Sequence, residues 1–410
     1  LSIFLSKIYS KNNIITSDLN KKTDTDFEFI KLNALLYSDI EKVVKKYEVD
    51  DVYHLAAILS AKGEENPLNT WEINMTSLFN VLELARKKLI KKIFWPSSIS
   101  VFGNTSLKNN TDQFSIKEPQ TVYGISKLSG ERWCEYYNNT YGIDVRSIRF
   151  PGIISSKTLP GGGTTDYAVS IFYSLIKKEV FKCFLNKETR LPMIYIEDVL
   201  RSIWMLMKAD KNNLRIKSSY NLSAFSFTPN ELYLSLQKRF KNFKIFYESD
   251  YRQKIADSWP NKINDNYSRK DWGWKPNYSF DEMVEEMIKK VSNKLNNETS
   301  DNFQMFIYVG ETRHDMKEQN SIIISQSELN LSNNEPNIWV KMGGCADIGE
   351  TTTSYLDYDG DGLGSGITAQ YCSGYEPDGW VTNSDDENDF CYSPWKNNVC
   401  RHNRYQLYRK

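Results

Sequence analysis

The first feature of the sequence that could do chemistry is a tyrosine followed four residues later by a lysine. Tyr123 and Lys127 stand at positions i and i+4 of a predicted helix, so their side chains share one face. A free phenol has a pKa of about 10, and a nearby ammonium favours the phenolate. The pair therefore predicts a general base that works near neutral pH. An ordinary amphipathic helix is the plainer interpretation of the pair taken alone.

Other polar positions surround this pair in a fixed order. Ser98 follows a predicted strand, and its hydroxyl can both donate and accept, so it can orient a substrate alcohol. Asn74 lies near the start of a largely apolar helix, and Arg149-Phe150-Pro151-Gly152 follows a later strand. These residues are far apart in the chain, so only a fold that gathers them could make them one site.

The elements that must gather these residues alternate between strands and helices. Predicted strands cover 13–17, 27–33, 51–57, 92–95 and 145–149, and predicted helices cover 1–11, 38–48, 70–88, 123–141, 167–178, 196–208 and 229–238. The alternation predicts an α/β fold with a parallel sheet covered on both faces. Ligands bind at the carboxyl ends of such strands, where Asp18, Ala56–Ala57 and Ser98 lie. Ser38 and Glu41 have the spacing of a capping box.

Composition separates the chain into parts. Hydrophobic residues make up 40% and charged residues 25%, which excludes a wholly disordered chain. The zero net charge and the lack of a long apolar stretch predict no nucleic-acid partner and no membrane span. Residues 301–410 nevertheless carry 17 acidic and 8 basic side chains and four of the six cysteines. We expect a domain at 1–299, a linker or partial domain at 300–344, and an acidic, loop-rich module at 345–410.

Taken in order, Asn74, Ser98, Tyr123-x-x-x-Lys127 and Arg149-x-Pro151-Gly152 resemble the extended short-chain dehydrogenase/reductase superfamily. Five segments narrow this resemblance to the short-chain-type L-threonine 3-dehydrogenases. They are His54–Ala61, Phe94–Ile99, Gly161–Ala168, Arg252–Pro260 and Arg269–Trp274. The similarity extends from Leu1 to about Asn296.

The resemblance implies an oxidation of the L-threonine 3-hydroxyl to 2-amino-3-oxobutyrate, with NAD as the hydride acceptor. Tyr123 would remove the hydroxyl proton, Ser98 would hold the hydroxyl, and Lys127 would lower the pKa of Tyr123 and bond the nicotinamide ribose. The family implies a cytoplasmic location for residues 1–299 and a homodimer through helices 70–88 and 123–141. Further cofactor contacts would come from Asp18, Leu55, Ala56, Ala57, Asn74, Pro151 and Ile153, and further substrate contacts from Ser60, Thr164, Thr165, Asp166 and Trp259.

The residue types between 161 and 166 suit a small zwitterion. Gly161–Gly163 leaves backbone N–H groups free to approach a carboxylate, and Thr164, Thr165 and Asp166 supply polar side chains. Trp259 could close the pocket against water. The plainer interpretation of the segment is a surface turn.

The family opens with a strand and a glycine-rich turn that holds a pyrophosphate at a helix N-terminus. Leu1 aligns just beyond that turn, and no Gly-x-x-Gly-x-x-Gly occurs in the first 60 residues. We therefore expect a Rossmann-like doubly wound sheet that lacks its first strand and glycine-rich loop and exposes two edges. From this we expect weak NAD binding and impaired activity. The fold should also carry a smaller substrate lobe and the separate acidic module.

The acidic module sets carboxylates on alternate residues at Asp357, Asp359 and Asp361, with glycines between them. Calcium takes six to eight oxygen ligands, and this spacing supplies them, so we expect a calcium site. The segment resembles the thrombospondin type 3 repeats of secreted proteins, which implies an extracytoplasmic location for this part. The plainer interpretation is a solvated acidic loop.

Two other functions stay open. A nucleotide-sugar epimerase or dehydratase would share Tyr123, Lys127 and Ser98, although Pro151-Gly152 and the 161–166 run favour the threonine enzyme. A non-catalytic calcium-binding fusion or remnant protein would use only the acidic module.

Overall fold

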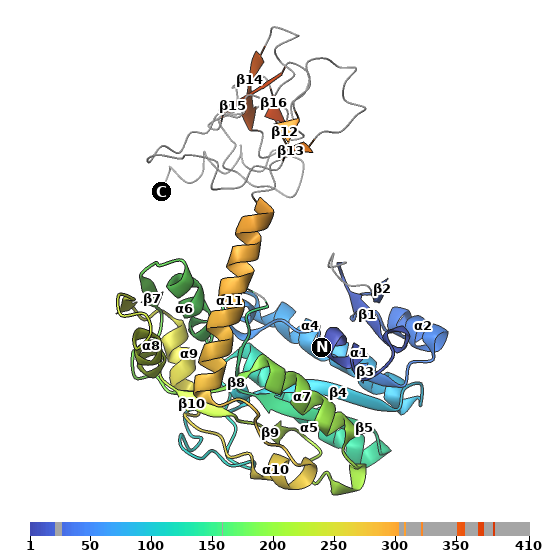
Figure 1. The fold of residues 1–410 in the computed structure, drawn as a ribbon. Coiled ribbons are helices and arrows are strands. Elements are labelled where there is room, and N and C mark those ends of the chain that lie inside the picture. The colour runs from blue at the N-terminus through green and yellow to red at the C-terminus, as the bar shows by residue number, and fades with distance from the viewer. Residues whose placement is uncertain are drawn as a thin grey trace, which may run out of the picture. The chain divides into compact units, whose positions relative to one another are not determined.

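The computed structural model describes residues 1–20, 27–157, 159–302, 307–308, 321–322, 351–356, 368–372 and 380–381 (Figure 1). The chain divides into two units, Leu1–Ile323 and Ile324–Lys410. The boundaries predicted at 299/300 and 344/345 lie on either side of this division and stay predictions.

Four parallel strands form the sheet that carries the candidate site. They follow the order β3 (Asp51–Tyr53), β4 (Lys92–Ser98), β5 (Asp144–Phe150) and β9 (Tyr220–Asn221). Crossover helices connect them, namely α4 (Pro67–Arg86), α5 (Val122–Tyr141) and α7 (Ile196–Lys208). Parallel neighbours require such crossovers, because a tight turn cannot return the chain to the same end of the sheet. The predicted α/β, Rossmann-like fold is confirmed.

The side chains of β4 show how both faces of the sheet are covered. Ile93 and Trp95 pack in one apolar cluster with residues of α4 and α5, whereas Phe94 packs in another with residues of α7. Successive side chains of a strand point to opposite faces, so a strand buried on both faces needs an unbroken apolar run. Residues 93–96 (Ile-Phe-Trp-Pro) provide that run, and helices lie on the two faces in Figure 1.

A second, two-stranded parallel sheet holds β1 (Ile15–Asp18) and β2 (Glu28–Lys31). Within the described residues, β1 pairs only with β2 and β3 pairs only with β4, so no ladder joins the two sheets. The predicted helix over 1–11 is shorter, with α1 at Ser2–Ser6 and a 3-10 turn at Lys11–Asn13.

The predicted capping box at Ser38 is wrong. Helix α2 (Tyr37–Tyr47) begins one residue earlier, its N-cap is Leu36, and no side chain caps it. Ser38 is therefore already inside the helix, where its hydroxyl bonds the Asp39 carboxylate over 3.4 Å.

The smaller lobe follows β5 in the chain. Its strands form two small sheets. The first has the order β10 (Phe225–Phe227), β8 (Leu191–Tyr195) and β6 (Gly152–Ile154). The second pairs β11 (Ile245–Tyr247) with β7 (Phe181–Cys183). Its helices are α6 (Tyr167–Ile176), α8 (Pro229–Gln237), α9 (Arg252–Ser258) and α11 (Phe280–Asn302). Helix α10 (Asn266–Trp272) instead packs against β9 of the four-stranded sheet. The short strands β12 (Ile307–Tyr308) and β13 (Ser321–Ile322) pair antiparallel beyond α11.

In the second unit, the described residues form one antiparallel sheet of three strands. Its order is β15 (Thr368–Cys372), β14 (Thr351–Leu356) and β16 (Trp380–Val381). In the part of the chain that the structure describes, no helix combines the length and apolarity that a membrane crossing needs.

Candidate active site

The site is built where the carboxyl end of β4 meets the first turns of α5. The Lys127 ammonium donates to the carbonyl oxygen of Pro96 over 2.7 Å. Ser98, the last residue of β4, hydrogen-bonds the Tyr123 phenol, which lies in the first turn of α5. The structure therefore brings together Ser98, Tyr123 and Lys127, as the sequence predicts.

A hydrogen bond from the backbone orients the Ser98 side chain. Its Oγ accepts from the backbone N–H of Ser100, in the 3-10 turn η2 (Ile99–Val101). That N–H occupies a lone pair and leaves the Ser98 proton free to be donated to Tyr123. The turn lies so close to α5 that a Cβ at Gly124 would be 2.3 Å from the Ser100 carbonyl oxygen. Only glycine fits this contact.

Burial sets the electrostatics of the tyrosine and lysine. It raises the pKa of the Tyr123 phenol to about 12, and the hydrogen bond from Ser98 acts in the opposite direction. Burial also lowers the pKa of the Lys127 ammonium to about 7. The Lys127 Nζ lies 5.4 Å from the Tyr123 ring centroid and 4.6 Å from that of Trp95. Desolvation therefore sets the direction of the Tyr123 shift, and the expected lowering of the Tyr123 pKa by Lys127 stays a prediction.

Asn74 is part of a clamp on the loop that follows β3. Its side-chain oxygen accepts from the Ile58 N–H over 2.8 Å, and its amide nitrogen donates to the Ile58 carbonyl over 3.1 Å. The same nitrogen donates to Ser126 Oγ on α5 over 3.2 Å. Asn74 is buried, so it holds the 54–60 loop against α4 and α5.

His54, where β3 ends, extends the same clamp. Its Nε2 lies 3.1 Å from Ser77 Oγ on α4. Burial and, to a smaller extent, the Lys127 charge together lower the pKa of this imidazole to about 4. His54 is therefore neutral at physiological pH.

The predicted cofactor contacts lie at the carboxyl ends of strands. Asp18 ends β1 and is exposed, Leu55 is 49% exposed beyond β3, and Ile153 is 38% exposed in β6. Exposed apolar side chains can pack against a cofactor ring, but the contacts of these residues with NAD stay predictions. Ala56 and Ala57 follow Leu55, and Pro151 is buried between β5 and β6.

The predicted substrate residues of the 164–166 turn are packed against β6. A Cβ at Gly152 would lie 2.8 Å from Thr165 Cγ2 and 2.2 Å from Met193 Sδ, so glycine permits this approach. Thr164 Oγ1 is buried and has no hydrogen-bond partner among the described residues. Asp166 accepts from the Gly163 N–H over 2.7 Å. The contacts of Thr164, Thr165 and Asp166 with a substrate stay predictions.

Ser60 and Trp259 lie on separate elements. Ser60 begins the short helix α3 (Ser60–Gly63), and Glu64 just beyond it accepts from the Val122 N–H at the start of α5. Trp259 is buried, and its carbonyl oxygen accepts from Lys108 Nζ over 3.1 Å. Their contacts with a substrate stay predictions.

Sequence reasoning missed a buried polar network next to the site. Ser97 Oγ donates to Glu131 Oε1 over 2.7 Å, and Arg149 makes a two-pronged ion pair with the same carboxylate. Glu131 stands one turn beyond Lys127 on the same helical face, so its spacing could have indicated a role.

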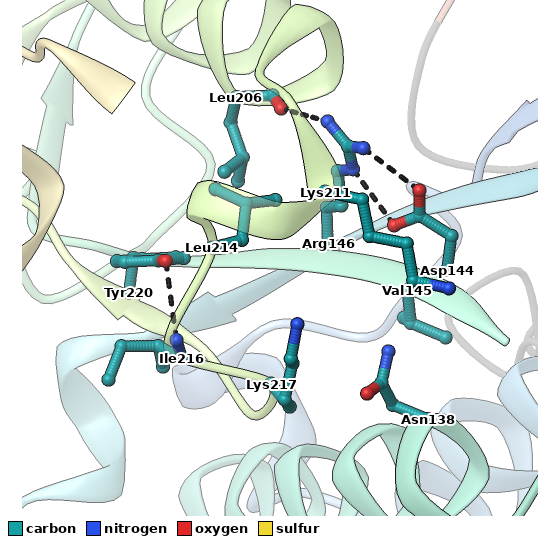
Figure 2. A pocket seen from close by; sticks show the side chains of 10 residues that line it. All are labelled: Asn138, Asp144, Val145, Arg146, Leu206, Lys211, Leu214, Ile216, Lys217 and Tyr220. Atoms are coloured by element: carbon teal, nitrogen blue, oxygen red, sulfur yellow. Dashed lines mark hydrogen bonds and ion pairs between the residues drawn. The ribbon is translucent and has the colours of Figure 1, made fainter. Parts of the chain in front are cut away.

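A further pocket, at the amino end of β5, does not belong to this site (Figure 2). Its lining includes Asp144, the first residue of β5, and Arg146, whose guanidinium is bonded to Asp144 and to the Leu206 carbonyl. Ser98 pairs with Phe150 at the opposite end of β5. Among the residues that the structure places, no cluster of His, Cys, Asp and Glu could hold a metal ion. Asp357, Asp359 and Asp361 lie outside the described residues.

Comparison with known proteins identifies the family of this fold and site. The model of the NAD dependent epimerase/dehydratase family matches residues 7–223. The chain belongs to this family. Within it, the chain is 42% identical over 292 residues to the mitochondrial L-threonine 3-dehydrogenase of Bos taurus, covering 70% of this chain and 78% of that protein.

Solved structures agree with this membership. The holo L-threonine dehydrogenase of Cupriavidus necator is 45% identical, with a TM-score of 0.70 over 71% of this chain and 94% of that one. A UDP-glucose 4-epimerase of Thermotoga maritima, at 19% identity and a TM-score of 0.62, shares the fold alone.

Proposed function

We propose that the chain is an L-threonine 3-dehydrogenase that oxidises the C3 hydroxyl of L-threonine to 2-amino-3-oxobutyrate. NAD, when bound, supplies the hydride acceptor. The observation that carries the proposal is the contact of Ser98 with Tyr123, one helical turn before Lys127, in a chain 42% identical to a threonine dehydrogenase.

The residues have separate roles in this proposal. Ser98 hydrogen-bonds the substrate hydroxyl and the Tyr123 phenol, and Tyr123 accepts the hydroxyl proton. Lys127 places a positive charge near the phenol, and this charge opposes the effect of burial on the Tyr123 pKa. The unpartnered Thr164 hydroxyl binds a polar group of the amino acid.

The first test is turnover of L-threonine with millimolar NAD, followed as NADH formation. Tyr123→Phe removes the proton acceptor, so we expect kcat to fall by about 10²-fold or more. Tyr136→Phe is the matched control, because Tyr136 lies on the same helix and is 46% exposed. Unchanged turnover in Tyr123→Phe would refute the proposal.

A nucleotide-sugar epimerase is the alternative within the family. The packing of Thr165 on Gly152 favours threonine, because it holds against β6 the 164–166 turn, whose polar residues suit a small zwitterion. A dehydrogenase accumulates NADH with L-threonine, whereas an epimerase interconverts UDP-sugars without net NADH. Conversion of UDP-glucose and no reduction of NAD by threonine would favour the alternative.

We also propose that the protein is a homodimer through α4 and α5. Large apolar side chains are exposed on these two helices, namely Leu68, Trp71, Ile125, Trp133, Tyr136 and Tyr141. Contiguous exposed apolar surface of this kind is typical of protein–protein contacts.

For residues 345–410 we propose calcium binding outside the cytoplasm, on the sequence pattern at Asp357, Asp359 and Asp361. Residues 1–299 taken alone suit the cytoplasm, and because the two parts of one chain imply different compartments, we assign no location to the whole chain. Calcium titration of the full chain by calorimetry should show binding that is lost in the triple Asp→Asn variant. If the variant bound calcium as well as the wild-type protein, these three aspartates would not form the proposed site.

A further inference from the structure

A buried ion pair lies beneath the candidate site. Arg149 of β5 donates its Nε–H and Nη2–H to the two oxygens of Glu131 on α5, each over 2.7 Å. The side chains are 1% and 0% exposed. Apolar residues of similar volume often replace such a pair without loss of stability, so the pair calls for an explanation other than stability.

The Glu131 carboxylate reaches the strand that carries Ser98. Ser97, the residue before Ser98, donates to Glu131 Oε1 over 2.7 Å. Pro96, one residue earlier, accepts from Lys127, which lies one turn before Glu131 on α5. The last three residues of β4 are thus bonded one after another to α5. A shift of Glu131 would therefore move Ser98.

Three other titratable groups near Lys127, namely His54, Tyr123 and Cys134, are neutral at physiological pH. Burial lowers the pKa of His54, at the end of β3, to about 4 and raises that of Tyr123 to about 12. Burial also raises the pKa of the Cys134 thiol on α5 well above its usual value, so this thiol carries no charge when Lys127 titrates. The charge of Glu131 is what remains to oppose the burial of Lys127.

Two cations act on the Glu131 carboxylate from other elements. Arg149 neutralises it from β5, and Lys117 approaches the pair from the loop before α5. Burial and, to a smaller extent, the Arg149 charge lower the pKa of Lys117 to about 8. Because Arg149 is paired with Glu131, we expect it to offset part of the negative charge that Glu131 presents to Lys127.

We propose that Glu131 and Arg149 are positioning residues, which fix the Ser98 end of β4 through Ser97 and whose opposite charges set the protonation of Lys127. Any effect of this pair on turnover rests on the proposed threonine oxidation. Its effect on the protonation of Lys127 can be measured without any substrate.

The test is a pH titration of the full chain, labelled with ¹³Cε-lysine and followed by NMR. The Lys127 signal is assigned by its loss in Lys127→Met. Glu131→Gln removes a negative charge and should lower the Lys127 midpoint by about 1 pH unit, whereas Arg149→Met should raise it. Asp144→Asn breaks the Arg146 pair at the other end of β5 and should leave the midpoint unchanged.

A purely structural pair would give a different result. Both single variants would then admit water, and both Lys127 midpoints would rise towards the usual value of a lysine. That result would overturn the proposal. The double variant Glu131→Gln/Arg149→Met removes both charges and should titrate within about 0.5 pH unit of wild type, so it replaces any single variant that fails to fold.

Turnover separates this inference from the proposed function. If L-threonine is oxidised, the pH profile of kcat should move with the Lys127 midpoint, down in Glu131→Gln and up in Arg149→Met. If neither the wild-type protein nor any variant oxidises threonine, the proposed function fails. The NMR titration then still decides whether Glu131 and Arg149 set the protonation of Lys127.

Discussion

At the scale of single residues, burial decides which groups around the site carry charge. His54, Tyr123 and Lys127 all have pKa values shifted towards the neutral form, and desolvation is the largest cause for each. The sequence showed the i and i+4 spacing of Tyr123 and Lys127 but not their burial, so the direction of the Tyr123 shift could not be predicted from it. The ion pair of Arg149 with Glu131 could not be predicted from the sequence either, because the two residues lie on different elements.

His54 should make stability depend on pH. Its pKa is about 4 in the folded chain and about 6.5 when unfolded, so between these values the unfolded chain binds more protons. The free energy of unfolding should therefore fall as pH drops from about 6.5 towards 4, by up to about 3 kcal/mol from this residue.

Urea unfolding at about pH 6.5 and about pH 4.5 measures this loss. His54→Gln keeps a polar partner for Ser77 but does not titrate, so it should lose less stability on acidification than wild type. Equal losses in the two proteins would show that His54 is not the group responsible.

At the scale of elements, the site depends on how closely η2 lies against α5. The sequence predicts β4, α5 and β5 well, because an apolar run and a helical period are local signals. The contact of Gly124 with Ser100 is not local, since 24 positions separate the two residues. The extent of β1 and the start of α2 were likewise set by surrounding contacts rather than by their own residues.

Gly124→Ala should separate the two elements. Its Cβ would lie 2.3 Å from the Ser100 oxygen, so η2 must move and take Ser98 away from Tyr123. A misplacement of about 1 Å can cost about 10²-fold in rate, and we expect kcat to fall by that order. Steady-state kinetics on folded protein measures the effect.

Gly142→Ala is the control for Gly124→Ala. It ends the same helix with φ of +68°, where alanine costs about 1 kcal/mol but contacts nothing within 4 Å. It should lower Tm slightly and leave kcat unchanged. Equal kcat losses in both variants would point to general destabilisation.

At the scale of the whole molecule, the exposed apolar face of α4 and α5 sets the expected assembly. Trp133 is 41% exposed and packs edge-on against Phe79, with ring centroids 5.0 Å apart. Trp133→Glu places a charge in the middle of this face, and we expect it to convert a dimer into a monomer in sedimentation equilibrium. Leu234→Glu on α8, at 47% exposure, should leave the dimer intact. A wild-type monomer would contradict the assembly.

The most direct test of the account is the fate of the hydrogen on C3 of threonine. L-Threonine deuterated at C3 is incubated with NAD and the full chain, and the reduced cofactor is analysed by mass spectrometry. The account predicts deuterium in the reduced cofactor, a rate below that of unlabelled threonine, and no reduction with Tyr123→Phe. Reduced cofactor without deuterium, or an active Tyr123→Phe protein, would contradict it.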